Sequence, residues 1–449
     1  MSSTMSEAEA DIDPRFLADW SGLQGGRPRE VLRPTSTAEV SAILQRCHAQ
    51  GQRVTIQGGM TGVSGGAVPD AGDVVINLER MNRIESLDEL EGLMQVQAGA
   101  TLQSVQEAAT AAGWHFAVDL GARGSCQMGG NASTNAGGIR VLRFGTMRDQ
   151  VLGVEAVLAD GTIVESLGRL IKNSTGLEAR QLFVGTEGTL GVITRLTLRL
   201  HPPMGEPQAA WVSASRFEHL PALLRRLRQR LGSSLCAFEF MSGDFVALAS
   251  QLSGTARPPA DSPWHVLVEV AGEAHASVSD LSEALQASLA DAVEAEEIED
   301  AAIATSLAQR EAFWRLREAI PEVLTRLKPA GTYDVGLPWR ETGPYVQEVD
   351  TALRTALPAA RHLFLGHLGD NNLHLICGPL DDAQHAACDR IVYEALRGRS
   401  GTVSAEHGVG RLKKEVLSIT RGESELALTR RIKMALDPAG ILNAGRVLD

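Results

Sequence analysis

The chain has 449 residues, 44% of them apolar, and carries 42 lysines and arginines against 55 aspartates and glutamates, a net charge of −13. This length predicts two or three domains, and an acidic chain without a basic run disfavours nucleic-acid binding. The 5 cysteines show no CxxC spacing, which favours reduced thiols in a cytoplasm over a disulfide framework or an iron–sulfur site. No signal-peptide features and no apolar run of about 18 residues are present, so we expect no transmembrane segment, while peripheral membrane attachment stays open.

Strands and helices are expected to alternate through the first part of the chain. A capping box from Ser36 to Glu39 opens a helix that stops at Gly51. Asp160-Gly161 marks the turn of a hairpin over 154–166. Alternating or continuous apolar residues predict further strands, and helical periodicity predicts a second helix. These strands are expected at 53–57, 73–78, 94–99 and 191–203, and the helix at 101–113.

The pattern of predicted strands and helices changes after the double proline at 202–203, where we expect a domain boundary. Helices are predicted at 220–231 and 278–293, a strand at 264–272, and an exposed loop at 253–263. The tail is predicted to be a short helix and a Pro-Gly turn. The expected segments are an N-terminal arm at 1–26, an α+β domain at 27–203, a second α+β domain at 204–430 and a C-terminal segment at 431–449.

A short stretch in the second domain carries two histidines. Residues 363–377, LFLGHLGDNNLHLIC, have the pattern of two apolar strands around a turn. If 369–372 form that turn, His367 lies opposite His374, with Cβ atoms about 5 Å apart on one face. The two imidazoles can then hold one metal ion. The alternative is two unrelated histidines, one buried and one exposed, and the hairpin alone does not decide.

Glycines cluster in two stretches, QGGMTGVSGG at 57–66 and DLGARGSCQMGGNASTNAGG at 119–138. Such runs let the backbone approach a ligand and turn several N–H groups towards it, which suits a pyrophosphate. The alternative is a pair of flexible surface loops. Neither GxGxxG nor GxxxxGK[ST] occurs, so a Rossmann or P-loop reading is disfavoured. The residues alone predict a site for a phosphate-bearing cofactor.

Several motifs, in order, resemble one known superfamily. QGGMTGVSGG, GGNASTNAGG and VGTEGTLGVITRLTLRL are similar to the flavin domain of the vanillyl-alcohol-oxidase (p-cresol methylhydroxylase) superfamily. GHLGDNNLH, SAEHGVGRLKK and DPAGILNAGR resemble the C-terminal half of its D-lactate, glycolate and D-2-hydroxyglutarate dehydrogenase branch. The resemblance implies an FAD-binding domain of two α+β subdomains, a cap domain with an antiparallel sheet that holds substrate and metal, and a C-terminal segment that returns to the flavin.

The resemblance also implies which residues contact FAD. The first glycine loop has Met60-Thr61 where some relatives have a histidine that binds FAD covalently, so we expect non-covalent FAD. The implied contacts are Gly58, Gly59, Met60, Thr61, Gly62, Ser64 and Gly65 at the pyrophosphate; Leu120, Gly121, Ser125, Gly129, Gly130, Asn131, Asn135 and Gly138 along the flavin; Glu187, Gly188, Gly191 and Ile193 at the adenine side; and Asn443 at the flavin ring.

Glu406 and His407, in VSAEHGVGRLKK, complete the predicted site. Glu406 joins His367 and His374 in a His₂Glu set, which suits Zn²⁺, with Mn²⁺, Fe²⁺ or Co²⁺ as alternatives. A surface salt-bridge pair is the competing interpretation of Glu406-His407. We expect the metal to polarise the hydroxyl of a D-2-hydroxy acid, His407 to remove its proton, and the Cα hydride to pass to flavin N5. The ordinary histidine pKa, near 6.5, suits that base.

Arg317 is the candidate clamp for the substrate carboxylate, with a solvated helix arginine as the alternative. Tyr333, in GTYDVGLP, is expected to line the pocket or simply to pack. Relatives that handle 2-hydroxyglutarate tend to show Lys, Asn and a hydroxyl residue where this chain has Thr332, Ile376 and Pro321. A second carboxylate therefore has fewer partners here, and an unpaired one costs about 1–3 kcal/mol. We expect a substrate with a less polar tail: D-lactate, a longer aliphatic acid or a mandelate-like acid.

Four alternatives remain at this point: a D-2-hydroxyglutarate dehydrogenase, an oxidase that uses O₂, a metal-dependent hydrolase that binds a nucleotide through the glycine loops, and a non-catalytic flavin subunit. The resemblance implies a quinone or an electron-transfer flavoprotein as electron acceptor. A homodimer is plausible, although no motif shows it.

Overall fold

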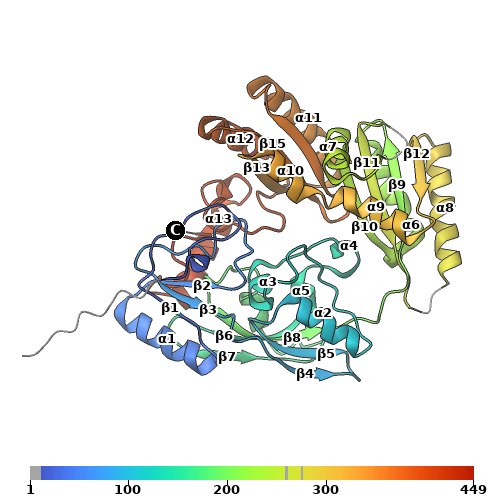
Figure 1. Ribbon diagram of the computed structural model, residues 1–449. Coiled ribbons are helices and arrows are strands. Elements are labelled where there is room, and N and C mark those ends of the chain that lie inside the picture. The colour runs from blue at the N-terminus through green and yellow to red at the C-terminus, as the bar shows by residue number, and fades with distance from the viewer. Residues whose placement is uncertain (1–11, 258–260, 275–276, 449) are drawn as a thin grey trace, which may run out of the picture.

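Three β-sheets organise the described residues, which are 12–257, 261–274 and 277–448 of this computed structural model. Figure 1 shows two smaller sheets in the lower part of the molecule and a larger one in the upper part. The sheets are separate and carry helices on their faces, which confirms the predicted α+β class. The predicted N-terminal arm is described only from residue 12, and the predicted loop at 253–263 only outside 258–260. The domain boundaries stay a prediction.

The first sheet is parallel and has a helix that behaves as its sequence predicts. Ser36 Oγ accepts the Glu39 N–H at the start of α1 (Thr37–Gln50), which ends at Gly51 with φ 60°. The strands in spatial order are β1 (Glu30–Leu32), β3 (Val74–Asn77) and β2 (Val54–Gln57).

The C-terminal segment extends this sheet. Leu442 forms a parallel bridge with Val54, and the Ile441 and Leu442 side chains are buried in the same core as the sheet and α1. Arg446, 1% exposed, donates to Thr55 Oγ1 over 3.0 Å. Ile441, Leu442 and Arg446 are therefore buried against the first sheet, although they lie about 400 positions after its first strand.

The second sheet is antiparallel and packs against short helices. Val157 pairs with Ile163, so Asp160-Gly161 forms the predicted hairpin turn. The apolar core lies between this sheet and the helices that follow β5 and precede β6. The strands in spatial order are β4 (Ile84–Asp88), β5 (Leu93–Gln97), β8 (Val192–Arg199), β6 (Val151–Val157) and β7 (Ile163–Ser166), and the helices are α2 (Leu102–Ala111), α3 (Met128–Thr134), α4 (Val141–Phe144) and α5 (Met147–Gln150).

The third sheet is antiparallel throughout and has helices on both faces. Its strands in spatial order are β12 (Asp300–Ile303), β9 (Gln208–Ala214), β11 (Trp264–Val270), β10 (Leu235–Ser242), β14 (Arg361–His367), β15 (Asn372–Gly378) and β13 (Gly331–Gly336). One face packs on α6 (His219–Leu231), α8 (Val278–Glu294), α11 (Trp339–Ala356) and α12 (Asp382–Glu394). The other face packs on α7 (Gly243–Ser253), α9 (Leu307–Arg317) and α10 (Ile320–Leu327).

Successive residues of these strands point to opposite faces, so each strand contributes to two cores. All eight residues of β10 are buried, because helices cover both sides. The polar residues Glu239, His374 and Asp334 share their face with α9 and α10, as the strand pairing requires. The fold therefore gathers these polar side chains at one end of a face that is otherwise apolar.

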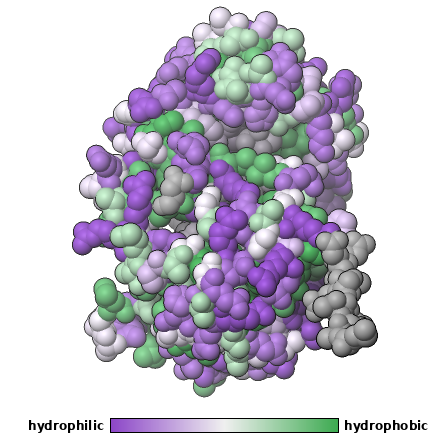
Figure 2. Space-filling model, turned by 90° about the vertical axis from the view of Figure 1, so that its left-hand side faces the viewer, coloured by the Kyte–Doolittle hydropathy of each residue, from purple (hydrophilic) through white to green (hydrophobic). Residues whose placement is uncertain are grey.

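The surface is largely polar. Hydrophilic side chains cover most of the face seen in Figure 2, with scattered apolar residues between them. Among the described residues, no helix combines the length and the apolar character needed to cross a membrane. The last long helix, α13 (Glu423–Leu436), has no fully buried residue.

His265 makes the stability of this domain depend on pH. It is 2% exposed on β11, and Trp211 Nε1–H donates to its Nδ1 over 3.1 Å. Burial lowers the pKa of His265 to about 4, so the unfolded chain, with a pKa near 6.5, takes up the proton first. The stability that the neutral ring contributes is present above pH 6.5 and is lost as pH falls towards 4, by roughly 3 kcal/mol.

We therefore expect the free energy of unfolding of His265→Asn to fall less between pH 7 and pH 4.5 than that of the parent chain. Urea denaturation of both proteins at the two pH values measures this. His201, whose pKa burial also lowers to about 4, is present in both proteins and cancels in the comparison. Equal pH dependence in the two proteins would contradict the prediction.

Candidate active site

The two histidines of the hairpin point to the same side, although the predicted register is wrong. The structure pairs His367 with Asn372 and Leu365 with His374. The turn begins one residue earlier than expected, at Leu368, and Asn371 closes it with φ 73°. Because the resulting shift moves the pairing by two residues, the side-chain faces are unchanged. The two imidazole rings lie 5.5 Å apart, centroid to centroid.

Glu406 meets these histidines. Its Oε1 lies 3.3 Å from His374 Nε2 and 3.5 Å from His407 Nε2. One ligand atom from each of His367, His374 and Glu406 falls within 4.8 Å of the others. Two imidazoles and a carboxylate are a donor set that suits Zn²⁺ and leaves a position open, so the residues present fit the predicted metal.

The loop that carries Glu406 and His407 is anchored by Asp334, which the sequence interpretation missed. Asp334 is fully buried on β13, and its Oδ2 accepts the backbone N–H groups of 405–407 over 2.9–3.2 Å. Ser404 Oγ donates to the same oxygen over 3.0 Å, and the buried Lys413 ammonium pairs with Oδ1. Burial opposes ionisation, but His407 and Lys413 outweigh it and lower the pKa of Asp334. This carboxylate fixes the loop backbone.

The strand alternation that brings Asp334 into the site takes Tyr333 out of it. Asp334 pairs with His374, so these two share a face. Tyr333 points the other way, where its ring packs on Tyr393 and its hydroxyl donates to Asp389 over 2.6 Å. Tyr333 therefore packs in the core instead of joining the pocket. The signal was present in the Tyr-Asp pair, because the residue opposite His374 has to share its face.

His407 lies between two carboxylates. Its Nδ1 is 3.3 Å from Asp334 Oδ1, and its ring stacks on His374 with centroids 5.6 Å apart. Its side chain is 31% exposed, so one edge is open to a small molecule. Burial alone would lower the pKa of His407, but Asp334 and then Glu406 raise it to about 9. The expected pKa near 6.5 did not include these two charges.

Arg317 is buried, which excludes the alternative of a solvated helix arginine. It is 5% exposed at the end of α9, and its Nε donates to Glu239 Oε2 over 2.8 Å. Glu239 Oε1 lies 2.9 Å from His367 Nδ1, and Arg317 Nη2 lies 3.1 Å from His367 Nε2. Glu239, 1% exposed on β10, was not predicted because it lies in an apolar strand far from the motifs. Arg317 and His367 are thus held by one carboxylate.

The predicted FAD contacts come from three segments that the fold brings together. Segment 57–66 follows β2, segment 120–138 contains α3, and segment 187–193 leads into β8. Contacts join them, since Glu187 N–H donates to Ser133 O over 2.7 Å and a Cβ on Gly59 would lie 1.9 Å from Ser125 O. The predicted residues of these segments are Gly58, Gly59, Met60, Thr61, Gly62, Ser64 and Gly65; Leu120, Gly121, Ser125, Gly129, Gly130, Asn131, Asn135 and Gly138; and Glu187, Gly188, Gly191 and Ile193.

These loops fit a bound dinucleotide. A Cβ added at Gly121 or Gly130 would meet no atom within 4 Å, so the backbone there borders open space. Gln127 Oε1 is buried beside Gly58 without a hydrogen-bond partner among the described residues. An open cradle next to an unsatisfied polar atom is what a polar ligand such as FAD would fill.

Two predicted FAD residues instead attach the flavin loops to the metal loop. Ser64 Oγ donates to the carbonyls of His407 and Gly408, each over 3.0 Å. The Glu187 side chain, predicted at the adenine side, accepts the N–H groups of Val409 and Gly410 over 2.7 and 2.9 Å. Burial raises the pKa of Glu187. Both side chains are committed to this junction because the loop at 404–411 crosses directly over the first glycine loop.

Asn443 is likewise used within the protein. Its Oδ1 accepts the Ile56 N–H over 2.9 Å, and its Nδ2 donates to Glu187 O over 2.6 Å. The carboxamide thus ties the C-terminal segment to β2 and to the turn before β8. If Asn443 also contacts the flavin ring, as predicted, only its backbone and the outer edge of its amide are available for that contact.

Two of the remaining pocket candidates, Thr332 and Ile376, lie on the same sheet as the cluster, and the third, Pro321, lies on α10. Thr332 pairs directly with Ile376, on the face that carries Asp334 and His374. Thr332 is exposed, whereas Ile376 is buried among the apolar side chains near α10. Pro321 is exposed at the first turn of α10. None of the three carries a charge towards this end of the site.

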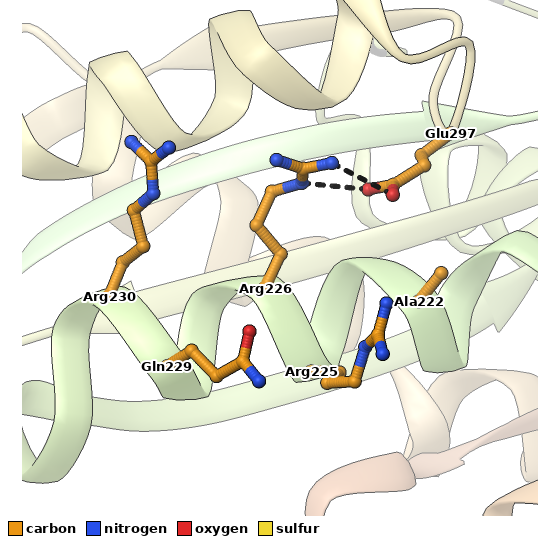
Figure 3. Close-up of a pocket in the computed structure, with 6 residues that line it drawn as sticks. All are labelled: Ala222, Arg225, Arg226, Gln229, Arg230 and Glu297. Carbon is orange, nitrogen blue, oxygen red and sulfur yellow. Dashed lines mark hydrogen bonds and ion pairs between the residues drawn. The ribbon is translucent and has the colours of Figure 1, made fainter.

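A separate hollow lies on the outer helices. It has a volume of about 210 Å³ between α6 and the turn after α8, and Arg225, Arg226, Arg230 and Glu297 line it with two neighbours (Figure 3). Arg226 forms a two-pronged pair with Glu297, 2.9 Å for each bond. None of the candidate site histidines and neither glycine loop lines this hollow, so we do not assign it to the active site.

Two family models match the chain. Residues 28–166 match an FAD binding domain, and residues 207–447 match the C-terminal domain of FAD linked oxidases. A mitochondrial D-2-hydroxyglutarate dehydrogenase of Bos taurus is 37% identical over 443 residues, which cover 97% of this chain and 80% of the relative. A putative mitochondrial D-lactate dehydrogenase of Schizosaccharomyces pombe is 36% identical, covering 96% of this chain and 84% of the relative.

Among solved structures, p-cresol methylhydroxylase with substrate bound superimposes with a TM-score of 0.75 at 14% identity, covering 97% of this chain and 92% of that one. This confirms the predicted fold. Two relatives bear mitochondrial names, and the cytoplasmic location expected from the sequence stays a prediction.

Proposed function

This chain belongs to the FAD-linked oxidases, and from that premise we propose that it oxidises a D-2-hydroxy acid to the 2-keto acid. One observation carries the proposal. The loop with Glu406 and His407 is fastened to the first glycine loop by Ser64 and to the third flavin segment by Glu187. A base and a metal-ligand set are thereby held against the predicted flavin site, which is where an alcohol has to be deprotonated as its hydride leaves.

The chain's residues fit two bound groups. FAD, held non-covalently by the three glycine-containing segments, supplies the acceptor for the hydride. A divalent ion on His367, His374 and Glu406, most simply Zn²⁺ with Mn²⁺, Fe²⁺ or Co²⁺ as alternatives, supplies a Lewis acid for the hydroxyl oxygen. The position that three protein ligands leave open is available to the substrate.

His407 is the proposed base. Asp334 faces its Nδ1, so a proton on Nδ1 leaves Nε2 as the acceptor, on the side of Glu406 and the metal-ligand set. The two carboxylates favour the protonated ring, and a cation held by Glu406 offsets one of them. His407 can then accept the hydroxyl proton and pass it to solvent through its exposed edge.

Arg317 is proposed to hold the substrate carboxylate. Its Nε is engaged by Glu239, while its Nη2 reaches the His367 side of the cluster. A guanidinium that one carboxylate holds through Nε can still offer its outer N–H groups to a second.

The tail of the substrate is proposed to be less polar than that of 2-hydroxyglutarate. Thr332, Ile376 and Pro321 offer no cation, so a distal carboxylate has fewer partners. The related bovine protein is named for 2-hydroxyglutarate and the yeast protein for D-lactate, so both substrates remain alternatives.

The flavin absorbance of the purified protein tests the central proposal. We expect D-2-hydroxy acids, but not their L-isomers, to bleach the band near 450 nm under anaerobic conditions, and we expect EDTA pretreatment to abolish the bleaching. Bleaching that survives EDTA would remove the metal role of His367, His374 and Glu406. A protein without a flavin band, or one that no 2-hydroxy acid bleaches, would overturn the proposal.

Comparing the turnover of D-lactate, D-mandelate and D-2-hydroxyglutarate tests whether the enzyme prefers a substrate with a less polar tail. We expect Thr332→Lys to raise kcat/KM for D-2-hydroxyglutarate about tenfold, because a charged hydrogen bond contributes roughly 1.5–3 kcal/mol, and to leave D-lactate nearly unchanged. Thr351→Lys, on the exposed side of α11, is the matched control. A parent enzyme that clearly prefers D-2-hydroxyglutarate would contradict the proposed tail.

Identifying the electron acceptor distinguishes a dehydrogenase from an oxidase that uses O₂. A quinone or an electron-transfer flavoprotein stays the proposed acceptor, and hydrogen peroxide formed under air without any added acceptor would favour an oxidase instead. Family membership leaves the hydrolase alternative without support. A homodimer stays a prediction.

A further inference from the structure

We propose that Glu239 is a positioning residue that sets the imidazole of His367 for the metal and the guanidinium of Arg317 for the substrate at the same time. This deepens, and rests on, the function proposed above. Glu239 is 1% exposed and lies on β10, next to the strand that carries His367. Within the described residues, the Glu239 side chain forms hydrogen bonds with Arg317 and His367 and none with His374, Glu406 or the glycine loops.

Each carboxylate oxygen has its own partner. Oε1 lies 2.9 Å from His367 Nδ1, and Oε2 accepts from Arg317 Nε over 2.8 Å. A carboxylate only accepts hydrogen bonds, so Nδ1 has to carry the proton. That tautomer leaves the lone pair on Nε2, the nitrogen that turns towards the cluster. A carboxylate behind a metal-binding imidazole also makes the ring a stronger ligand.

Arg317 currently shares that lone pair. Its Nη2 lies 3.1 Å from His367 Nε2, so the guanidinium and a metal ion compete for the same nitrogen. When a metal takes Nε2, Nη2 has to leave, but Glu239 retains Arg317 through Nε. The group that is released then faces the metal site and can bind the carboxylate of the substrate. Glu239 therefore links metal loading to the availability of the clamp.

Glutamine at this position tests the two-oxygen argument. Glu239→Gln keeps the volume but has only one oxygen, so it can accept from Arg317 or from His367, not from both. If the oxygen faces Arg317, the amide NH₂ faces Nδ1, and the ring has to move its proton to Nε2, where it blocks the metal. Competition between the protein and a colorimetric Zn²⁺ chelator, with FAD bound, measures this. We expect Zn²⁺ affinity to fall about 10- to 100-fold.

A second readout separates positioning from general damage. In the Zn²⁺-saturated variant we expect KM for the best D-2-hydroxy acid to rise about tenfold or more, with a smaller change in kcat. Glu155→Gln is the matched control. That carboxylate is also buried and hydrogen-bonded, to Thr194 and Arg195 on β8, but it is remote from the histidines. We expect this control to keep the Zn²⁺ affinity and the KM of the parent chain.

The outcomes separate this inference from the proposed function. If the parent chain binds Zn²⁺ and is bleached by D-2-hydroxy acids, but Glu239→Gln matches it in both Zn²⁺ affinity and KM, the inference is wrong and the function stands. If the parent chain fails, the function itself fails. Should Glu239→Gln lose FAD or unfold, Glu239→Asp is measured instead. Its shorter side chain keeps the charge but cannot reach both partners, so an unchanged Zn²⁺ affinity and KM in that variant would equally overturn the inference.

Discussion

Replacing His407 with glutamine is expected to reduce kcat for the best D-2-hydroxy acid by about 10²- to 10⁴-fold, the usual contribution of a positioned base. Glutamine keeps a polar side chain of similar length but cannot take up a proton at neutral pH. His407 is partly exposed and its backbone, not its ring, makes the contacts with Ser64 and Asp334 Oδ2. The fold and the flavin content should therefore remain.

Anaerobic stopped-flow measurement of flavin reduction gives this rate directly, without contributions from the electron acceptor. His385→Gln is the matched control, because His385 lies half-exposed on α12 and pairs with a carboxylate one turn away, Asp389. A rate for His407→Gln within a few fold of the parent rate would remove His407 from the proton transfer.

Asp334→Ala is expected to have the largest effect on stability, a loss of about 3–5 kcal/mol in the free energy of unfolding. The substitution leaves the buried Lys413 ammonium, 5% exposed, without its counter-charge, and it leaves the N–H groups of Glu406 and His407 without an acceptor. The Ala405 N–H keeps the backbone carbonyl of residue 334. The same change frees the loop that holds Glu406 and His407, so activity should fall together with stability.

Urea denaturation measures the first effect, and flavin reduction at a temperature where the variant is folded measures the second. Asp334→Asn keeps an acceptor oxygen and should recover part of the stability, although the Lys413 ammonium loses its counter-charge and keeps only neutral partners such as Ser404 Oγ. Glu394→Ala, which removes an exposed carboxylate on α12 that pairs with the exposed Arg397, should cost less than about 1 kcal/mol. If Asp334→Ala were as mild as Glu394→Ala, the anchoring role of Asp334 would be excluded.

The sequence predicts the parts of this protein whose signals are local. Turn chemistry gave the hairpin at Asp160-Gly161, a capping residue gave the start of α1, and ordered motifs gave the family. The prediction that His367 and His374 share a face is correct although the predicted pairing of the two strands is wrong by two residues. A shift of two residues leaves every side chain on the same face of the sheet.

The residues that sequence interpretation missed are those that the sheet order brings in. Glu239 lies 128 positions before His367, and the two meet only because β10 and β14 are neighbours in the third sheet. Asp334 and Lys413 are 79 positions apart and meet across the metal loop. Glu187 lies within one of the family motifs and was predicted at the adenine side of FAD, yet its side chain accepts the N–H groups of 409 and 410. The position of a residue in a motif does not fix the direction of its side chain.

The strand-like bridge between Leu442 and Val54 has a consequence for the order in which the protein is made. The first sheet begins near residue 30, but its core includes Ile441 and Leu442, and the buried Arg446 holds Thr55 from the far end of the chain. During synthesis the ribosome exposes the first glycine loop long before these residues exist. The first sheet therefore keeps one edge unpaired until residues 441–446 have left the exit tunnel, so nascent chains stalled before residue 441 should bind FAD poorly.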